Sequence, residues 1–502
     1  MTVYNINLGI GWASSGVEYA QAYRYKLLSQ MGIDSKYIFT DFISYATISE
    51  LTSNIGFKDE DIIWLYSYFT DQTISPSRVT LEDVQSSIQE KFREVDRTAT
   101  SVKFILSNKD AYMVAYFKKG NTSIVNRVEY VSKGVLIRKD YFAPQKLFTE
   151  YYLPIEGKVT VYQRRFFNAD GSVAYDEIIR NDCSIFKFNN AVSYSKEELM
   201  LKLMESLKLT SRDLVLLDRS TGIGQAVFRK VKPAKLGVVV HAEHYNKNLT
   251  TDENILWNNF YEYQFTNADK VDFFITSTEE QKRILASQFQ KYTSYCPNIF
   301  AIPVGSVSIK KNALSERMPY SAMTASRLAI EKHIDYLVRA VVRAKQVIPQ
   351  LVFDIYGTGG EESKLRTIIS QENASEYIRL RGHKDLSLIY KDYQVYLTAS
   401  KSEGFGLTLL EATASGLPII GFDVPYGNIN FVQEGKNGYL IQVDDLMSET
   451  DIIQAIADRI IRLFKNSHLF DFYEYSYHIA AEYDDEHIKL KWQTLLKEME
   501  ND

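Results

Sequence analysis

Short, continuous apolar runs that end in polar loops recur in two separate parts of this sequence. In the first half they read NINLGI, DLVLLDRS and LGVVVHAEH, and in the second half SAMTASR, LVFDIYG and LPIIGFD. Such runs are typical of strands that are buried on both faces, and these strands belong to parallel sheets covered by helices. The chain is therefore predicted to be an α/β protein with two doubly wound, Rossmann-like domains, whose ligands lie at the carboxyl ends of the strands.

A different pattern interrupts the first of these domains. From about residue 102 to residue 188, apolar and polar residues alternate, and the chain turns at Lys-Gly and Asn-Ala-Asp-Gly sequences. Alternation of this kind indicates an antiparallel meander. The predicted organisation is a split first domain, a β-rich add-on domain, a second Rossmann-like domain and a C-terminal helix expected to cross back to the first domain. Their ranges are 1–75 with 195–305, 76–194, 306–485 and 486–502.

Charge and cysteine content limit the classes of function. The net charge is −5, from 58 basic and 63 acidic residues spread along the chain, so no overall field favours nucleic acid. Two cysteines, Cys183 and Cys296, lie far apart without CxxC spacing, which argues against a disulfide framework or a zinc site. The start of the chain lacks a signal-peptide pattern, and no run of about 18 apolar residues occurs. These features predict a protein of the reducing cytoplasm.

Two cations follow the first strand of the second domain. In TASRLAIEKH, Arg327 and Lys332 lie just after the strand and before a helix, where backbone N–H groups and the helix dipole already favour an anion. This arrangement suits a diphosphate. The alternative is a pair of solvated surface charges.

Two glutamates surround a glycine-rich turn in SEGFGLTLLEATASGLPII. Gly404 and Gly406 allow backbone amides to approach a phosphate oxygen, and a helix is predicted to start near residue 406 or 407. Glu411 lies about one turn into this helix, where its carboxylate can accept two hydrogen bonds from a ribose diol. Glu403 precedes the turn and is expected nearer the sugar. The alternative is two unrelated acidic residues, one at a helix start and one on a solvated helix face.

Metal-dependent and dinucleotide-dependent chemistry lack support in the sequence. His241 and His244 in HAEH are only three residues apart, without the H-E-x-x-H spacing, and a lone histidine at a strand end commonly binds a loop carbonyl. The acidic triplet at residues 59–61 precedes its apolar strand and is interpreted as a solvated turn. YGTGGEE lacks the G-x-G-x-x-G spacing, and no Walker-A sequence occurs. The sequence therefore predicts no metal or dinucleotide cofactor.

The motifs of the second domain, taken together, resemble a known family. Arg327 with Lys332, the E-x7-E pair Glu403 and Glu411, the GFGL turn and the SGLPII sequence resemble the nucleotide-sugar domain of retaining glycosyltransferases of family four, which have the GT-B fold. Over the whole chain, NINLGIGWASSG, DRSTGIGQ, VVVHAEHY, TNADKVDFFI and IPVGS resemble catalytic subunits of the accessory-secretion glycosyltransferases of streptococci and staphylococci.

This resemblance implies a function and partners. Such enzymes transfer N-acetylglucosamine from UDP-GlcNAc to serine and threonine of serine-rich repeat adhesins, the first step of O-glycosylation before export. They work with a related non-catalytic co-subunit, and the β-rich add-on domain would bind acceptor and partner. A cytoplasmic location with peripheral contact to the membrane is expected. The alternatives are a non-catalytic, acceptor-binding subunit of such a complex and a transferase that acts on a wall polymer.

The resemblance also implies roles for individual residues. Arg327 and Lys332 would neutralise the leaving diphosphate, Glu411 would hold the ribose, and His241 would contact the sugar near the reacting carbon. The catalytic residues would be Arg327, Lys332, Glu403 and His241. The other residues that would bind UDP-GlcNAc are Gly16, Val17, Glu18 and Tyr19 on the diphosphate, Gly382 and His383 on the uracil, and Gly404, Phe405 and Gly406 beside Glu403.

Overall fold

The computed structural model describes residues 1–12, 15–107, 110–181, 183–309, 311, 316–444, 446–466 and 468–501. The chain forms two compact units. The first comprises Met1–Val239 and Tyr263–Asp272, and the second comprises Val240–Glu262 and Phe273–Asp502.

The first unit contains a parallel sheet with the strand order β15-β14-β1-β2-β3. Its strands are short, and in β14 every residue is buried, as the continuous apolar run predicts. The strands are β1 (Thr2–Asn7), β2 (Asp34–Phe39), β3 (Ile62–Trp64), β14 (Leu214–Leu217) and β15 (Lys235–Val240). The helices are α1 (Gly16–Gln30), α2 (Ile48–Ser53), α3 (Leu81–Ser86), α4 (Lys196–Ser206), α5 (Gly224–Lys230) and α6 (Glu262–Thr266), whose first residue belongs to the second unit.

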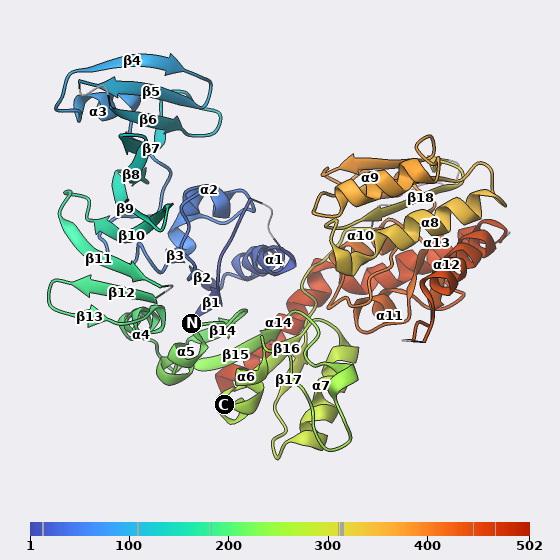
Figure 1. Cartoon of the computed structure of the whole chain (residues 1–502). Coiled ribbons are helices and arrows are strands. Elements are labelled where there is room, and N and C mark those ends of the chain that lie inside the picture. The colour runs from blue at the N-terminus through green and yellow to red at the C-terminus, as the bar shows by residue number, and fades with distance from the viewer. Residues whose placement is uncertain are drawn as a thin grey trace. The chain divides into compact units, whose positions relative to one another are not determined.

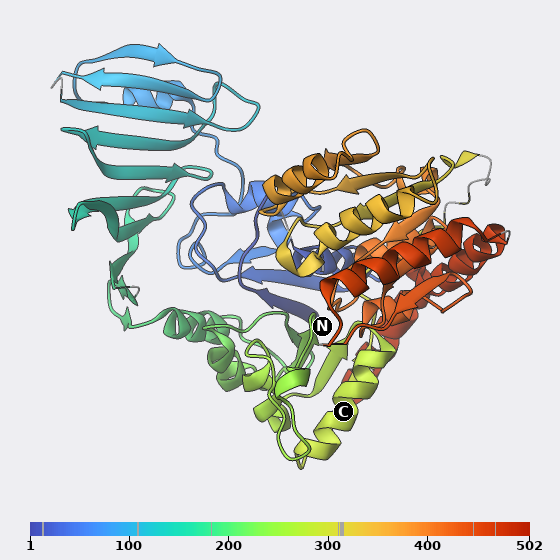
Figure 2. The same cartoon turned by 45° about the vertical axis from the view of Figure 1, so that its right-hand side comes forward.

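The insert is a single antiparallel sheet whose strands follow one another in chain order, as Figures 1 and 2 show. Its strands are β4 (Phe92–Arg97), β5 (Ser101–Leu106), β6 (Ala111–Phe117), β7 (Val125–Ser132), β8 (Val135–Phe142), β9 (Lys146–Ile155), β10 (Lys158–Phe167), β11 (Val173–Arg180), β12 (Cys183–Phe188) and β13 (Val192–Ser193). The sheet begins ten residues before the alternation at residue 102 suggests. All side chains of β4 are exposed, so this edge strand carries no pattern of burial that alternation could reveal.

Aromatic side chains join the insert to the first parallel sheet. Phe42 and Trp64 pack on Phe148 of β9, with ring centroids 5.2 and 6.2 Å apart. The guanidinium of Arg164 lies 3.5 Å above the Phe42 ring. The hydroxyl of buried Tyr175 donates to the carbonyl of Tyr66 at 2.6 Å. Large aromatic rings supply much of the packing energy of a domain junction. These contacts therefore hold the inserted sheet against β3 and the loops that follow β2 and β3.

The second unit contains a parallel sheet with the strand order β20-β19-β18-β21-β22-β23. Apolar faces of α8 and α12 cover it, and Leu337, Val341, Ile456 and Ile460 lie in its core. The strands are β18 (Ser321–Ala325), β19 (Val352–Tyr356), β20 (Ile378–Gly382), β21 (Val395–Leu397), β22 (Ile419–Phe422) and β23 (Gly438–Ile441). The second unit also contains β16 (Phe273–Thr276) and β17 (Ile299–Ala301), which pair in parallel. The helices are α7 (Glu279–Tyr292), α8 (Ile334–Lys345), α9 (Glu362–Gln371), α10 (Leu407–Ala414), α11 (Gly427–Phe431), α12 (Glu449–Phe464), α13 (Leu469–Ala480) and α14 (Asp485–Asn501).

The acidic triplet at residues 59–61 differs from its prediction as a solvated turn. It forms the 3-10 helix η1 (Asp59–Asp61), and Asp61 accepts hydrogen bonds from Tyr25 and Lys36, both at 2.9 Å. Asp59 accepts one from Ser49 at 3.0 Å. The triplet is therefore a structural junction between α1, α2 and β2. Its partners are distant in sequence, which is why the local pattern suggested only a turn.

Two further expectations concern cysteines and the membrane. Cys183 and Cys296 are both free and exposed. Within the described ranges, no helix is both long and apolar enough to cross a membrane.

Candidate active site

Lys332 and Glu403 form an ion pair in the second unit, although 71 positions separate them in the sequence. Lys332 ends the 3-10 helix η5 (Ile330–Lys332), which follows β18, and Glu403 lies in the loop after β21. About one fifth of each side chain is exposed to solvent, 21% for Lys332 and 19% for Glu403. Both loops leave the carboxyl ends of neighbouring strands, as the doubly wound fold predicts. The structure thus brings together the predicted diphosphate cation and the predicted sugar-side carboxylate.

Arg327 follows the same strand, β18, and lies at the same edge of the sheet, but its side chain is held only by an exposed ion pair. Its side chain is 72% exposed, and its Nη2 donates to Glu331 one helical turn further on, at 2.7 Å. An exposed pair of this kind contributes little to stability and exchanges readily for another anion. The guanidinium can therefore turn to a diphosphate at small cost.

Backbone contacts on two sides fix the glycine loop at residues 403–406. A Cβ added to Gly404 would lie 2.3 Å from the carbonyl oxygen of His241, and a Cβ on Gly427 would lie 2.2 Å from that of Phe405. The amides of Tyr426 and Gly427 donate to the Glu403 carbonyl at 2.9 and 2.8 Å. Gly406 has a φ of +86° and forms the N-cap of α10. Only glycine fits these close approaches and this conformation, so the loop is preorganised.

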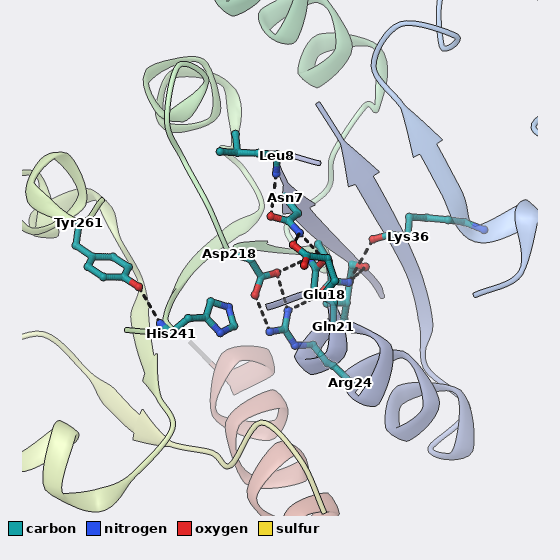
Figure 3. Close-up of polar contacts among 11 residues, drawn as sticks. Asn7, Leu8, Glu18, Gln21, Arg24, Lys36, Asp218, His241 and Tyr261 are labelled. Carbon is teal, nitrogen blue, oxygen red and sulfur yellow. Dashed lines mark hydrogen bonds and ion pairs between the residues drawn. The ribbon is translucent and has the colours of Figure 1, made fainter. Parts of the chain in front are cut away.

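The segment that holds Gly404 is itself anchored. The amides of His241 and Ala242 both donate to the Tyr261 hydroxyl at 3.0 Å, and Figure 3 shows the bond to His241. His244 is buried and forms two hydrogen bonds. Its Nε2 lies 2.7 Å from Gln288 Oε1, and its Nδ1 lies 3.0 Å from the Tyr426 hydroxyl. Burial lowers the pKa of His244 to about 4, so its imidazole is neutral at physiological pH. His244 therefore has a structural role, which its place in HAEH does not reveal.

Glu411 lies on α10 and accepts a hydrogen bond from the Tyr390 hydroxyl at 2.8 Å. The side chain is accessible to solvent, yet protein atoms crowd it, and loss of solvation raises its pKa. The bond from Tyr390 opposes this rise, while the charge of Asp385 adds to it. Gly382 ends β20 with a φ of +70°, and His383 follows it at the same edge of the sheet. Tyr390 is a site neighbour that sequence motifs did not indicate.

The predicted diphosphate loop of the first unit starts α1. Ser15 is the N-cap, and its amide donates to Glu18 Oε2 at 2.5 Å in a capping box. The other carboxylate oxygen of Glu18 accepts from Asn7 at 3.3 Å. Glu18 is thus occupied in shaping the loop, and its role would be to present the amides of Gly16 and Val17 to an anion. Tyr19 is 46% exposed, and Ala13 and Ser14 of this loop lie outside the described residues.

A buried polar network lies beneath α1, and the sequence motifs did not reveal it (Figure 3). Asp218, at the end of β14, accepts hydrogen bonds from both terminal nitrogens of Arg24, at 2.8 and 3.0 Å, and from Gln21 at 2.7 Å. Arg24 also donates to Asn5 at 2.7 Å. The Arg24 and Asp218 side chains are only 4% and 0% exposed. This network fixes α1 to the carboxyl end of the sheet and thereby fixes the position of the loop.

We expect Gly404→Ala to lower turnover by about 10²-fold, because the new Cβ must displace the loop from the His241 carbonyl and misplacement by about 1 Å has effects of this size. Gly360→Ala in the same unit is the matched control, since its Cβ would meet nothing within 4 Å. Steady-state rates of both variants test this, and equal rates would show that the loop tolerates displacement.

Two family models match the chain. Residues 94–190 match the "GtfA extended beta-sheet domain", and residues 308–478 match "Glycosyl transferases group 1". The first range lies within the inserted sheet. The second contains the predicted donor-binding residues Arg327, Lys332, Glu403 and Glu411.

A relative covers the full chain. It is the UDP-N-acetylglucosamine–peptide N-acetylglucosaminyltransferase GtfA subunit of Streptococcus gordonii, 51% identical over 503 residues, which cover 100% of this chain and 99% of the relative. The chain belongs to the GtfA-subunit family. Its fold is accordingly GT-B, with the extended β-sheet domain inserted in the first Rossmann-like domain.

Two solved structures of this family match over the whole length. The pneumococcal O-GlcNAc transferase GtfA in complex with UDP and GlcNAc is 49% identical with a TM-score of 0.95, and the match covers 100% of this chain and 99% of that one. A chain of the GtfA/B complex is 51% identical with a TM-score of 0.93, and the match covers 100% of both chains. Both matches span the insert and both Rossmann-like domains, so the family assignment applies to the whole chain.

Proposed function

We propose that this chain transfers N-acetylglucosamine from UDP-GlcNAc to serine and threonine hydroxyls of a polypeptide, a serine-rich repeat adhesin, as the first step of its O-glycosylation. The observation that carries the proposal is the Lys332–Glu403 ion pair beside the rigid glycine loop. The Lys332 ammonium suits the diphosphate, and the neighbouring Glu403 carboxylate suits the hydroxyls of the sugar. The names of the GtfA relatives and the ligands of the pneumococcal structure support it.

The chemistry proposed is electrostatic and positional. The acceptor hydroxyl oxygen forms a bond to the anomeric carbon as the bond from that carbon to the diphosphate oxygen breaks, and the hydroxyl proton passes to a diphosphate oxygen on the same face, with retention. Arg327, Lys332 and the loop amides stabilise the charge that develops on the leaving group. Glu403 orients the sugar hydroxyls, and His241 contacts the sugar near the reacting carbon.

The remaining donor contacts follow from the same proposal. Glu411 holds the ribose diol, and Gly382 with His383 binds the uracil through backbone groups. The amides at the start of α1 contact the diphosphate, with Glu18 holding their loop in shape. The proposed reaction uses no metal. Among the described residues, no group of three or more His, Cys, Asp or Glu side chains is placed to hold one.

We further propose a hetero-oligomer with a related, non-catalytic co-subunit, supported by the GtfA/B complex. The inserted sheet would bind acceptor and partner. Because the adhesin would be modified before export, the proposed location is the cytoplasm, with peripheral contact to the membrane.

Transfer of labelled N-acetylglucosamine tests the function directly. A serine-rich polypeptide should become labelled by the chain together with its co-subunit, while ribitol-phosphate wall polymer should not. Label on the polymer alone would contradict the proposed acceptor. Absence of UDP release under every condition would favour the alternative of a non-catalytic acceptor-binding subunit.

Glu411→Gln is expected to weaken UDP binding by about tenfold at neutral pH, the scale of hydrogen bonds to a charged group. Because the pKa of Glu411 is raised, its carboxylate is lost as pH falls through that raised value, at a higher pH than for an ordinary glutamate. The affinity difference between the two proteins should therefore shrink on acidification. Titration calorimetry with UDP across pH measures it, and a constant difference would argue against a contact through the ionised carboxylate.

A further inference from the structure

The parallel sheet of the second unit changes direction between β18 and β21. From these two neighbouring strands the order runs through β19 to β20 on one side and through β22 to β23 on the other. The ladder between them ends at the pair Met323 and Tyr396, while β18 stays paired with β19 as far as Ala325. In doubly wound sheets the ligand lies at the carboxyl ends of the strands, where the order reverses in this way. Both loops with predicted diphosphate contacts leave the sheet at this point.

The side chain of Tyr396 takes the place of the ladder beyond this pair. Its hydroxyl lies 2.8 Å from the carbonyl oxygen of Ala325 and 3.3 Å from the amide nitrogen of the same residue. It also lies 3.0 Å from the hydroxyl of Thr408, in the first turn of α10. A tyrosine hydroxyl has one proton to donate and two lone pairs that accept, so these contacts use its full capacity.

These contacts join the two segments that carry the predicted diphosphate contacts. Ala325 leads directly into residues 326–332, which include both predicted cations and are here called the cation loop. Thr408 lies two residues after the glycine loop at residues 403–406. The hydroxyl of Tyr396 therefore links the start of the cation loop to the helix that follows the glycine loop.

Backbone contacts hold the other flank of the cation loop. The amide of Ser326 donates to the Tyr356 carbonyl at 3.1 Å, and the amide of Leu328 donates to the Thr358 carbonyl at 3.0 Å. These bonds fix the cation loop to the segment that follows β19. Because they do not reach the glycine loop, the spacing between the two loops depends on side chains, namely the ion pair described above and Tyr396.

Tyr396 is suited to fix this spacing. Its side chain is 2% exposed, and its ring packs in an apolar cluster with Tyr390, Phe405 and Leu409. Burial raises the pKa of Tyr396 to about 12, so the hydroxyl keeps its proton at physiological pH. Since the cluster holds the ring, replacement by phenylalanine keeps the packing and removes only the hydrogen bonds.

From this arrangement we propose that Tyr396 is a positioning residue for the diphosphate of the donor, whose hydroxyl sets the spacing between the cation loop and the glycine loop so that both reach the same diphosphate. The inference rests on the proposed function, which assigns these loops to the diphosphate. Binding geometry of this kind is sensitive to shifts of about 1 Å. Loss of the hydroxyl should therefore reduce the affinity that the diphosphate adds to uridine.

The test measures how much more tightly UDP binds than uridine. Titration calorimetry on the chain assembled with its co-subunit, without acceptor, gives the affinity of UDP directly and that of uridine by competition with UDP. Wild type should bind UDP more tightly. Tyr396→Phe should lower the ratio of the two affinities by about tenfold, the scale of one hydrogen bond to a charged group. Thr408→Val, which removes only the contact to α10, should lower the ratio by a smaller factor.

Tyr390→Phe is the matched control. Tyr390 is also 2% exposed and lies in the same cluster, but its hydroxyl bonds at 2.8 Å to Glu411, the residue assigned to the ribose. Uridine and UDP share the ribose, so this variant should weaken both ligands equally and keep the ratio of wild type. Both phenylalanine variants lose buried hydrogen bonds and should melt at a lower temperature. Only the ratio distinguishes a positioning role from a contribution to stability.

The outcomes separate this inference from the function on which it rests. A ratio for Tyr396→Phe equal to that of wild type, or an equal fall for Tyr390→Phe, would overturn the positioning role and leave the transferase proposal intact. If Tyr396→Phe does not fold, the ratio for Thr408→Val decides in the same way. Equal affinity of wild type for uridine and UDP would overturn the diphosphate site and with it the proposed function.

Discussion

Replacing Arg327 with alanine is expected to lower the turnover number for sugar transfer by about 10² to 10³-fold, the effect of removing one preorganised donor that stabilises transition-state charge. The stability of the fold should be unaffected, because among the described residues this exposed side chain bonds only to Glu331, and such pairs contribute little to stability. Steady-state rates of UDP release in the presence of acceptor, with circular dichroism as a check of folding, provide the measurement.

Arg366→Ala is a control of the same kind in the same unit. Arg366 is 63% exposed and pairs with Glu362 one helical turn away at 2.7 Å, as Arg327 does with Glu331. It lies on α9, outside the predicted site. Its replacement should leave turnover unchanged. If Arg327→Ala were as active as Arg366→Ala, Arg327 would have no part in stabilising the leaving diphosphate.

The second large effect concerns stability. Asp218→Ala should reduce the free energy of unfolding of the first unit by about 3 to 5 kcal/mol, because it leaves the Arg24 guanidinium buried without its counter-charge. Burial alone would lower the pKa of Arg24, but attraction and hydrogen bonding to Asp218 raise it overall, so the residue remains charged in the wild-type fold. Thermal and urea unfolding monitored by tryptophan fluorescence measure the loss.

The variant Glu94→Ala tests whether the loss of stability in Asp218→Ala comes from burial of the charge or from loss of the ion pair itself. Glu94 accepts two hydrogen bonds from Arg97 at 2.8 and 2.9 Å, the same bidentate geometry, but on the exposed strand β4. Its loss should leave the melting temperature unchanged. The double variant Arg24→Met with Asp218→Leu should recover much of the stability, since no buried charge remains. A small effect of Asp218→Ala would show that water enters the site.

Strand and helix positions followed closely from local pattern. The runs predicted as buried strands became β14, β18, β19 and β22 within a residue or two, because a strand covered on both faces must be apolar throughout. The helix after GFG starts at Leu407, as the glycine turn indicated. The exposed strand β4 and the packed acidic triplet at residues 59–61 were missed or misinterpreted because their surroundings, which decide their structure, are distant in sequence.

The sequence by itself determined the α/β class and the inserted meander, since these depend on periodicity. It also predicted the residues of a sugar-diphosphate site, from motif spacing within single loops. Only the tertiary structure decided which groups act together. It paired Lys332 with Glu403, buried Arg24 against Asp218, and placed the hydroxyl of Tyr396 beneath the predicted donor site. The reason is physical: burial, close approach and charge pairing depend on neighbours that folding brings from distant parts of the chain.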